Sequence, residues 1–142
     1  MMIPGEHLGR PDLKVSGFQL WVHGLERLDP ENWLQVTAHC GANGADVWVS
    51  GSILMVCDLV ALQDGCRQLL RNEVERIVVS PFEPELEFEL NKVDSLGHFE
   101  FIVKITPDLL KQSHEFRFDI DQSYLQQIVR DCDLVLQLSA DE

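Results

Sequence analysis

The chain has 142 residues, a formal net charge of −13 and 45% hydrophobic residues, and this size and composition suit one globular domain with its own core. The excess of acids disfavours binding to nucleic acid or anionic membranes and favours a basic protein partner, with solubility alone as the alternative explanation. No stretch approaches the roughly eighteen consecutive apolar residues of a membrane-spanning helix.

Residues 1–14 contain no apolar run of the kind that marks a signal peptide, and they include scattered prolines. The four cysteines have no paired spacing, which disfavours a disulfide framework. We therefore expect a flexible tail over residues 1–14, a single domain over residues 15–142, and a cytoplasmic location.

Three strands are predicted to open the domain. Apolar and polar side chains alternate over residues 18–23, 33–39 and 46–50, a period of two that is typical of strands with one buried face. The segment Gly41-Ala42-Asn43-Gly44 predicts a hairpin turn between the second and third strands. It lacks the Lys and Ser/Thr of a phosphate-binding loop, so we expect no phosphate site there.

The three tryptophans lie on the opposite phase of these strands from the aliphatic side chains: Trp21, Trp33 and Trp48. Large apolar residues are usually buried, so we expect the helices to cover this face and the tryptophans to be core. The alternative is an exposed aromatic patch, which would supply anchors for a protein interface.

The period changes after residue 55. Apolar residues then recur at spacings of three and four, which predicts an amphipathic helix over residues 56–70. Gly65 lies inside this helix and costs about 1 kcal/mol relative to alanine, so we expect the helix to be bent or weakly formed there. Cys57, Cys66 and Cys132 fall within apolar helical patterns and are expected to be buried, reduced thiols.

Four further strands are predicted over residues 74–79, 85–90, 98–105 and 115–120. Alternate positions in and before the second of these are glutamates: Glu83, Glu85, Glu87 and Glu89. The intervening Leu86, Phe88 and Leu90 predict a core face, so the other face carries only carboxylates. These like charges repel one another unless cations meet them, which suggests a cationic partner.

A final helix is predicted to begin after Asp121, which is a suitable N-cap, with an apolar stripe over residues 124–136. The predicted fold is therefore α+β: a mostly antiparallel sheet of about seven strands with two helices packed on one face, in the order βββαββββα. A helix follows each group of strands, which hints at a duplicated unit, but the two halves match too weakly in sequence to establish one.

The sequence carries no recognisable nucleophile with a base, metal cluster or phosphate loop. His39 and Cys40 are adjacent strand residues that point to opposite faces, so they are poorly placed to share a metal ion. A straight strand of glutamates does not converge on calcium, and Glu85, Glu87 and Glu89 are expected to be solvated rather than tuned for catalysis. We predict a protein that is not an enzyme and has no cofactor or metal.

Four pieces of the chain, in this order, resemble the WapI family of bacterial immunity proteins. They are Asp29-x-x-Asn32-Trp33-Leu34-x-Val36 with Trp48; Asp58-Leu59-x-x-Leu62 with Leu69; Phe82-Glu83-Pro84-x-Leu86-x-Phe88; and Asp121-Gln122-Ser123-Tyr124-Leu125. Together they span residues 18–138. The resemblance implies a protein that neutralises the toxin domain of a wall-associated, contact-dependent toxin, with no catalytic residues and no cofactor.

Charge and resemblance suggest the same partner, a basic toxin domain. Among toxin classes a nuclease is expected, because nuclease sites are lined with Lys and Arg. The residues predicted to bind it are Glu83, Glu85, Glu87, Glu89, Asp119 and Asp121. Two alternatives stay open. One is a protein-interaction module that forms a homodimer or other homo-oligomer through a strand edge or the tryptophan face. The other is a small-ligand-binding domain or enzyme whose site is assembled from scattered residues.

Overall fold

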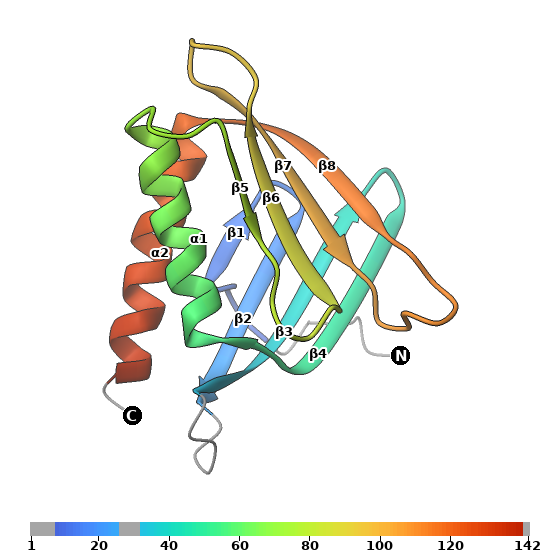
Figure 1. The fold of residues 1–142 in the computed structure, drawn as a ribbon. Helices are drawn as coiled ribbons and strands as arrows, with labels where there is room; N and C mark the ends of the chain where they lie inside the picture. The colour runs from blue at the N-terminus through green and yellow to red at the C-terminus, as the bar shows by residue number, and fades with distance from the viewer. Residues whose placement is uncertain (1–7, 26–31, 141–142) are drawn as a thin grey trace.

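The computed structural model describes residues 8–25 and 32–140, which contain eight strands and two helices (Figure 1). In chain order these are β1 (Leu13–Val15), β2 (Phe18–Leu25), β3 (Trp33–Ala42), β4 (Ala45–Met55), α1 (Val56–Leu70), β5 (Arg76–Val79), β6 (Leu86–Lys92), β7 (His98–Ile105), β8 (Glu115–Asp121) and α2 (Gln122–Ala140). The predicted α+β class and antiparallel pairing are confirmed.

The strands form two sheets rather than the single sheet that we expected. The N-terminal sheet has the order β1-β2-β3-β4 and the C-terminal sheet the order β5-β6-β7-β8, and every neighbouring pair is antiparallel. Each sheet is a simple meander followed directly by one helix, so the two halves of the chain share one order of elements.

The two sheets face each other across an aromatic and aliphatic core. The ring of Phe18 from β2 meets the rings of Phe88 and Phe101 at centroid distances of 5.1 and 6.0 Å. Edge-to-face contacts of this kind add to the free energy of burying the rings. Strands from both halves therefore contribute to one continuous core.

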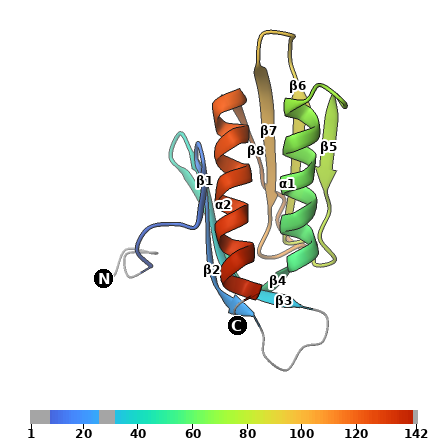
Figure 2. The same cartoon turned by 90° about the vertical axis from the view of Figure 1, so that its left-hand side faces the viewer.

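The two helices lie side by side and close one side of the core (Figure 2). Besides each other, α1 packs beside β5 and α2 beside β1, so each helix lies against the first strand of the other half. This crossed packing joins the halves into one folded unit. It also explains why the apolar stripe of each helix is buried, although the strands are divided between two sheets.

Gly65 lies on the side of α1 that packs against Ile77 of β5. The helix runs unbroken from Val56 to Leu70 through this residue. A Cβ atom added to Gly65 would overlap Cδ1 of Ile77 and lie 3.2 Å from its Cβ. Glycine at this position therefore allows the contact between helix and strand.

The N-terminal segment packs on the outer face of the N-terminal sheet. β1 begins at Leu13, inside the predicted tail, and the Leu13 side chain is buried. The peptide N–H of Val22 donates to Asp12 Oδ2 at 2.7 Å, and the Trp21 indole N–H donates to the Gly9 carbonyl at 3.0 Å. Residues 1–7 of the predicted tail lie outside the described residues.

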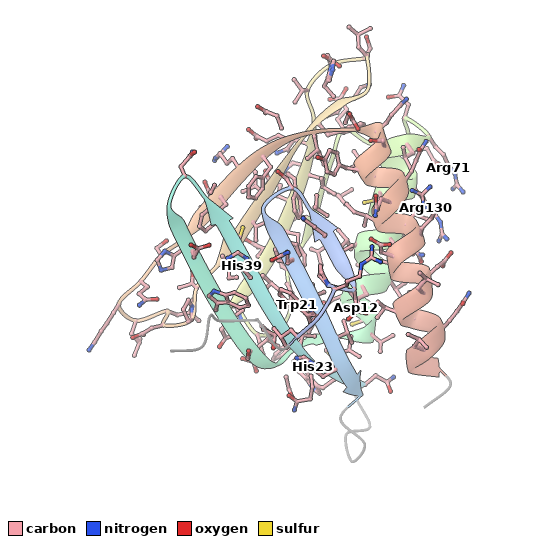
Figure 3. The ribbon with its side chains drawn as sticks, turned by 180° about the vertical axis from the view of Figure 1, so that it is seen from behind. Asp12, Trp21, His23, His39, Arg71 and Arg130 are labelled. Atoms are coloured by element: carbon pink, nitrogen blue, oxygen red, sulfur yellow. The ribbon has the colours of Figure 1, made fainter. Side chains whose placement is uncertain are left out.

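This segment, and not a helix, covers part of the tryptophan face, which Figure 3 shows with Trp21 and His39 on it. Trp21 is buried as expected, whereas Trp33 and Trp48 are only partly buried. The expectation that the helices cover this face was wrong, because both helices pack against the core that the inner faces of the two sheets share.

Three of the four cysteines are buried: Cys40, Cys66 and Cys132. Burial raises the pKa of Cys40 and of Cys132 to about 12, so these thiols stay protonated and unreactive at neutral pH. Cys57 is exposed, contrary to its predicted burial, because it lies near the start of α1 on a side of the helix that faces solvent.

Candidate functional site

The predicted acidic strand is β6 of the C-terminal sheet, and its alternation is confirmed. The side chains of Leu86, Phe88 and Leu90 are buried in the core. Glu87 and Glu89 point the other way, to the outer face of the sheet, where their side chains are 30% and 23% exposed.

Cations from neighbouring strands meet these two glutamates. Glu87 pairs with Lys104 of β7 across the ladder (Nζ to Oε2, 3.3 Å), and Glu89 pairs with Arg76 of β5 (2.8 Å). The carboxylates are thus partly neutralised within the sheet itself. The sequence predicted which face the glutamates occupy, but not the strands beside them, because the register of pairing is not encoded in the alternation.

Glu89 is stabilised in its ionised form by neighbouring donors. Hydrogen bonds from the Asn91 amide and from Arg76 lower the pKa of Glu89 below its usual value. Ile102 lies opposite Glu89 on β7 and also faces outward, yet it is only 5% exposed. Arg117 of β8 lies on the other side of Ile102, so this apolar residue is flanked by Glu89 and Arg117. The aliphatic stems of long charged side chains explain its burial.

Glu83 and Glu85 lie in the connection between β5 and β6, just before the strand begins. One carboxylate oxygen of Glu85, Oε2, is shielded from solvent and accepts no hydrogen bond from the described residues. Glu83, Glu85 and Glu87 therefore lie at the same end of the C-terminal sheet.

Asp119 and Asp121 lie away from that end. The pairing register places Asp119 opposite Glu100, and Asp121 opposite His98 near the β6–β7 turn. Asp121 is the N-cap of α2, as predicted: its carboxylate accepts the Ser123 peptide N–H at 2.9 Å, and the bond from the Ser123 hydroxyl lowers the pKa of Asp121. The six predicted residues therefore form no single cluster.

A groove of about 620 Å³ lies at the end marked by Glu83, Glu85 and Glu87. The β5–β6 connection (residues 80–85) and the β7–β8 connection (residues 106–114) form its two walls. Its apolar lining includes Pro81, Pro84 and Leu109, and its charged or titratable lining includes Glu87, Lys104, His114 and Glu115.

Two large apolar side chains project beside this groove. Phe82 is 86% exposed and Leu110 is 95% exposed, and each is next in sequence to a residue that lines the groove. Neither residue was assigned a role in binding from the sequence: Phe82 entered only as part of the family resemblance, and Leu110 was not singled out. The available signal was an aromatic or leucine side chain at a position where the alternation of the strands has ended.

The outer face of the N-terminal sheet has a different character. His39 Nε2 lies 2.7 Å from Asp46 Oδ1, and the His39 ring packs 4.4 Å from Trp48, which stacks on Trp21. Cys40 is buried on the other side of the strand, so the predicted opposition of His39 and Cys40 is confirmed. Across the part of the chain that the structure describes, three metal-ligating side chains do not gather at any point.

The chain belongs to the WapI-like immunity protein family, whose model matches residues 12–138. A search of curated proteins and a search of solved structures each found no match. Within residues 8–25 and 32–140, neither helix combines the length and the hydropathy that crossing a bilayer requires.

Proposed function

We propose that this protein binds and neutralises a cognate bacterial toxin domain in the cytoplasm, and that it does so without catalysis. The single observation that carries the proposal is the family match, which covers almost all of the folded chain. The net charge of −13 supports a basic partner.

A nuclease is the toxin class that best fits this charge. A nuclease must hold a phosphate backbone, so Lys and Arg side chains surround its active site. An acidic inhibitor that covers this surface competes with the nucleic acid for the same cations. Long-range attraction raises the association rate, and a smaller set of desolvated contacts sets the dissociation rate.

The acidic side of the proposed contact is the outer face of the C-terminal sheet and the end where β6 begins. Glu87 and Glu89 lie on this face, and Glu83 and Glu85 lie just before them in the β5–β6 connection. Asp119 contributes to the same field from β8, whereas Asp121 is held in the helix cap and is a weaker candidate for direct contact.

The test first identifies a large secreted toxin gene next to this one, and then measures association with the purified C-terminal domain that it encodes. The variant is Glu85→Gln/Glu87→Gln/Glu89→Gln, which removes three charges without placing new cations beside Arg76 and Lys104. We expect the association rate at low salt to fall about fivefold or more, with a shallower dependence on ionic strength.

A matched control is Asp64→Asn/Glu73→Gln/Glu75→Gln, which removes three exposed acids from α1 and its connection to β5. Its net charge equals that of the test variant, so it measures the effect of overall charge alone. If the unmodified protein does not bind the toxin domain, the proposed function is wrong. If the two variants slow association equally, the contact is not on this face of the sheet.

A further inference from the structure

The two halves of the chain provide an internal comparison for the groove. At the end of the N-terminal sheet that corresponds to the groove, β1 joins β2 through residues 16–17 and β3 joins β4 through residues 43–44. The second of these is a two-residue turn in which Asn43 and Gly44 both have positive φ, as tight hairpins require. Two residues are thus enough to connect strands in this architecture.

The C-terminal sheet uses far longer connections at the same positions, residues 80–85 and 106–114. Longer surface connections than a hairpin needs are commonly functional. These two also converge, because both line one groove. Folding of the sheet does not require their additional length, since the other half of the molecule pairs its strands without it.

The side chains on these connections are unusual for solvent-facing loops. Phe82 and Leu110 are almost fully exposed, and Leu109, which lines the groove, is 48% exposed. An exposed aromatic ring with neighbouring leucines beside a concave surface is the composition of the centre of a protein interface.

The charges around these apolar residues define the partner. The acids that line the groove or lie on its walls are Glu83, Glu85, Glu87, Asp108 and Glu115, and the lysines are Lys104 and Lys111. The groove is therefore surrounded mostly by negative charge, which suits a partner that carries Lys or Arg.

We propose that the groove between residues 80–85 and 106–114 is the anchor site for the toxin domain, and that it accepts an apolar side chain of the toxin flanked by Lys or Arg. This inference rests on the proposed function. Phe82 and Leu110 pack against the toxin around the groove, and the glutamates bind the flanking cations. The anchor determines the lifetime of the complex, because desolvated apolar contacts act mainly on dissociation.

The experiment measures binding of the same toxin domain to Phe82→Ala/Leu110→Ala by surface plasmon resonance. Both side chains are exposed, so the variant should keep the unfolding midpoint of the unmodified protein. The matched control is Leu96→Ala, in the β6–β7 turn at the opposite end of the same sheet, where the side chain is 80% exposed.

We expect the double variant to raise Kd at least tenfold, chiefly through faster dissociation, and Leu96→Ala to stay within twofold. If the double variant stays within tenfold of the unmodified protein, or if Leu96→Ala weakens binding as much, the groove is not the anchor. Binding of the unmodified protein would still support the proposed function in that case. Absence of binding by the unmodified protein would instead overturn both proposals.

Discussion

Replacing Gly65 by alanine should destabilise this protein, although alanine is the better helix residue. Gly65 is buried in the middle of α1, and the helix meets β5 at this point. Two opposing effects decide the outcome: the gain in helix propensity, and the space that the new methyl group needs.

The structure indicates which effect is larger. Alanine in place of glycine inside a helix gains about 1 kcal/mol. The added Cβ would overlap Cδ1 of Ile77 and lie 3.2 Å from both its Cβ and its Cγ1, so rotation of the Ile77 side chain cannot remove all of the crowding. Overpacking of this kind typically costs 1–3 kcal/mol. We therefore expect a net loss of about 1 kcal/mol in the free energy of unfolding.

Urea unfolding at 25 °C of four proteins measures this balance: the unmodified chain, Gly65→Ala, Ile77→Ala and the double variant. Ile77→Ala alone should destabilise, since Ile77 packs against the core. Ile77→Ala removes the overlap with Cδ1 and the close contact with Cγ1 and leaves only the 3.2 Å contact with Cβ. In that background Gly65→Ala should therefore cost less than in the unmodified chain, or become stabilising by up to about 1 kcal/mol. A gain in stability for Gly65→Ala alone, or the same effect in both backgrounds, would refute the close-packing explanation.

Two further predictions concern the outer face of the C-terminal sheet. Ile102→Ala should lower the free energy of unfolding by about 2 kcal/mol, because charged side chains bury Ile102. Val78→Ala, at a 44% exposed position on the same face, should cost under about 1 kcal/mol. Equal costs in urea unfolding would mean that Ile102 is not covered. The pKa of Glu89 is lowered in the folded state, so its contribution to stability is present above its unfolded pKa of about 4.3 and is lost as pH falls through the folded value. The stability difference between the unmodified protein and Glu89→Gln should therefore shrink between pH 6 and pH 3, and a constant difference would contradict the assignment.

Most elements were predictable because hydrophobic periodicity reports local structure. The change from a period of two to spacings of three and four located α1, and Asp121 located the start of α2. β1 was missed because three residues are too short to show alternation. The division into two sheets was also missed, because alternation reveals which face of a strand is buried but not which strand lies beside it.

The same limit applies to the candidate site. The alternation placed Glu87 and Glu89 on the outer face correctly, but their pairing with Lys104 and Arg76 depends on the register between strands. The groove could not be predicted in the same way, because its walls are connections without any period. Only the folded chain brings residues 80–85 and 106–114 together.

The ion pairs on the outer face do not remove these glutamates from binding. A partly exposed pair such as Glu87–Lys104 contributes only about 0–1 kcal/mol, so a guanidinium from a partner can replace the lysine at little cost. Before binding, the pairs hold the carboxylates in fixed positions and reduce repulsion along β6. Attraction at a distance then depends on the acids around the contact face, and Glu87 and Glu89 contribute to it although Lys104 and Arg76 partly offset their charge. Loss of charge on this face should therefore act on the association rate, and loss of Phe82 and Leu110 on the dissociation rate, so that kinetics separate the two contributions where affinity alone would not.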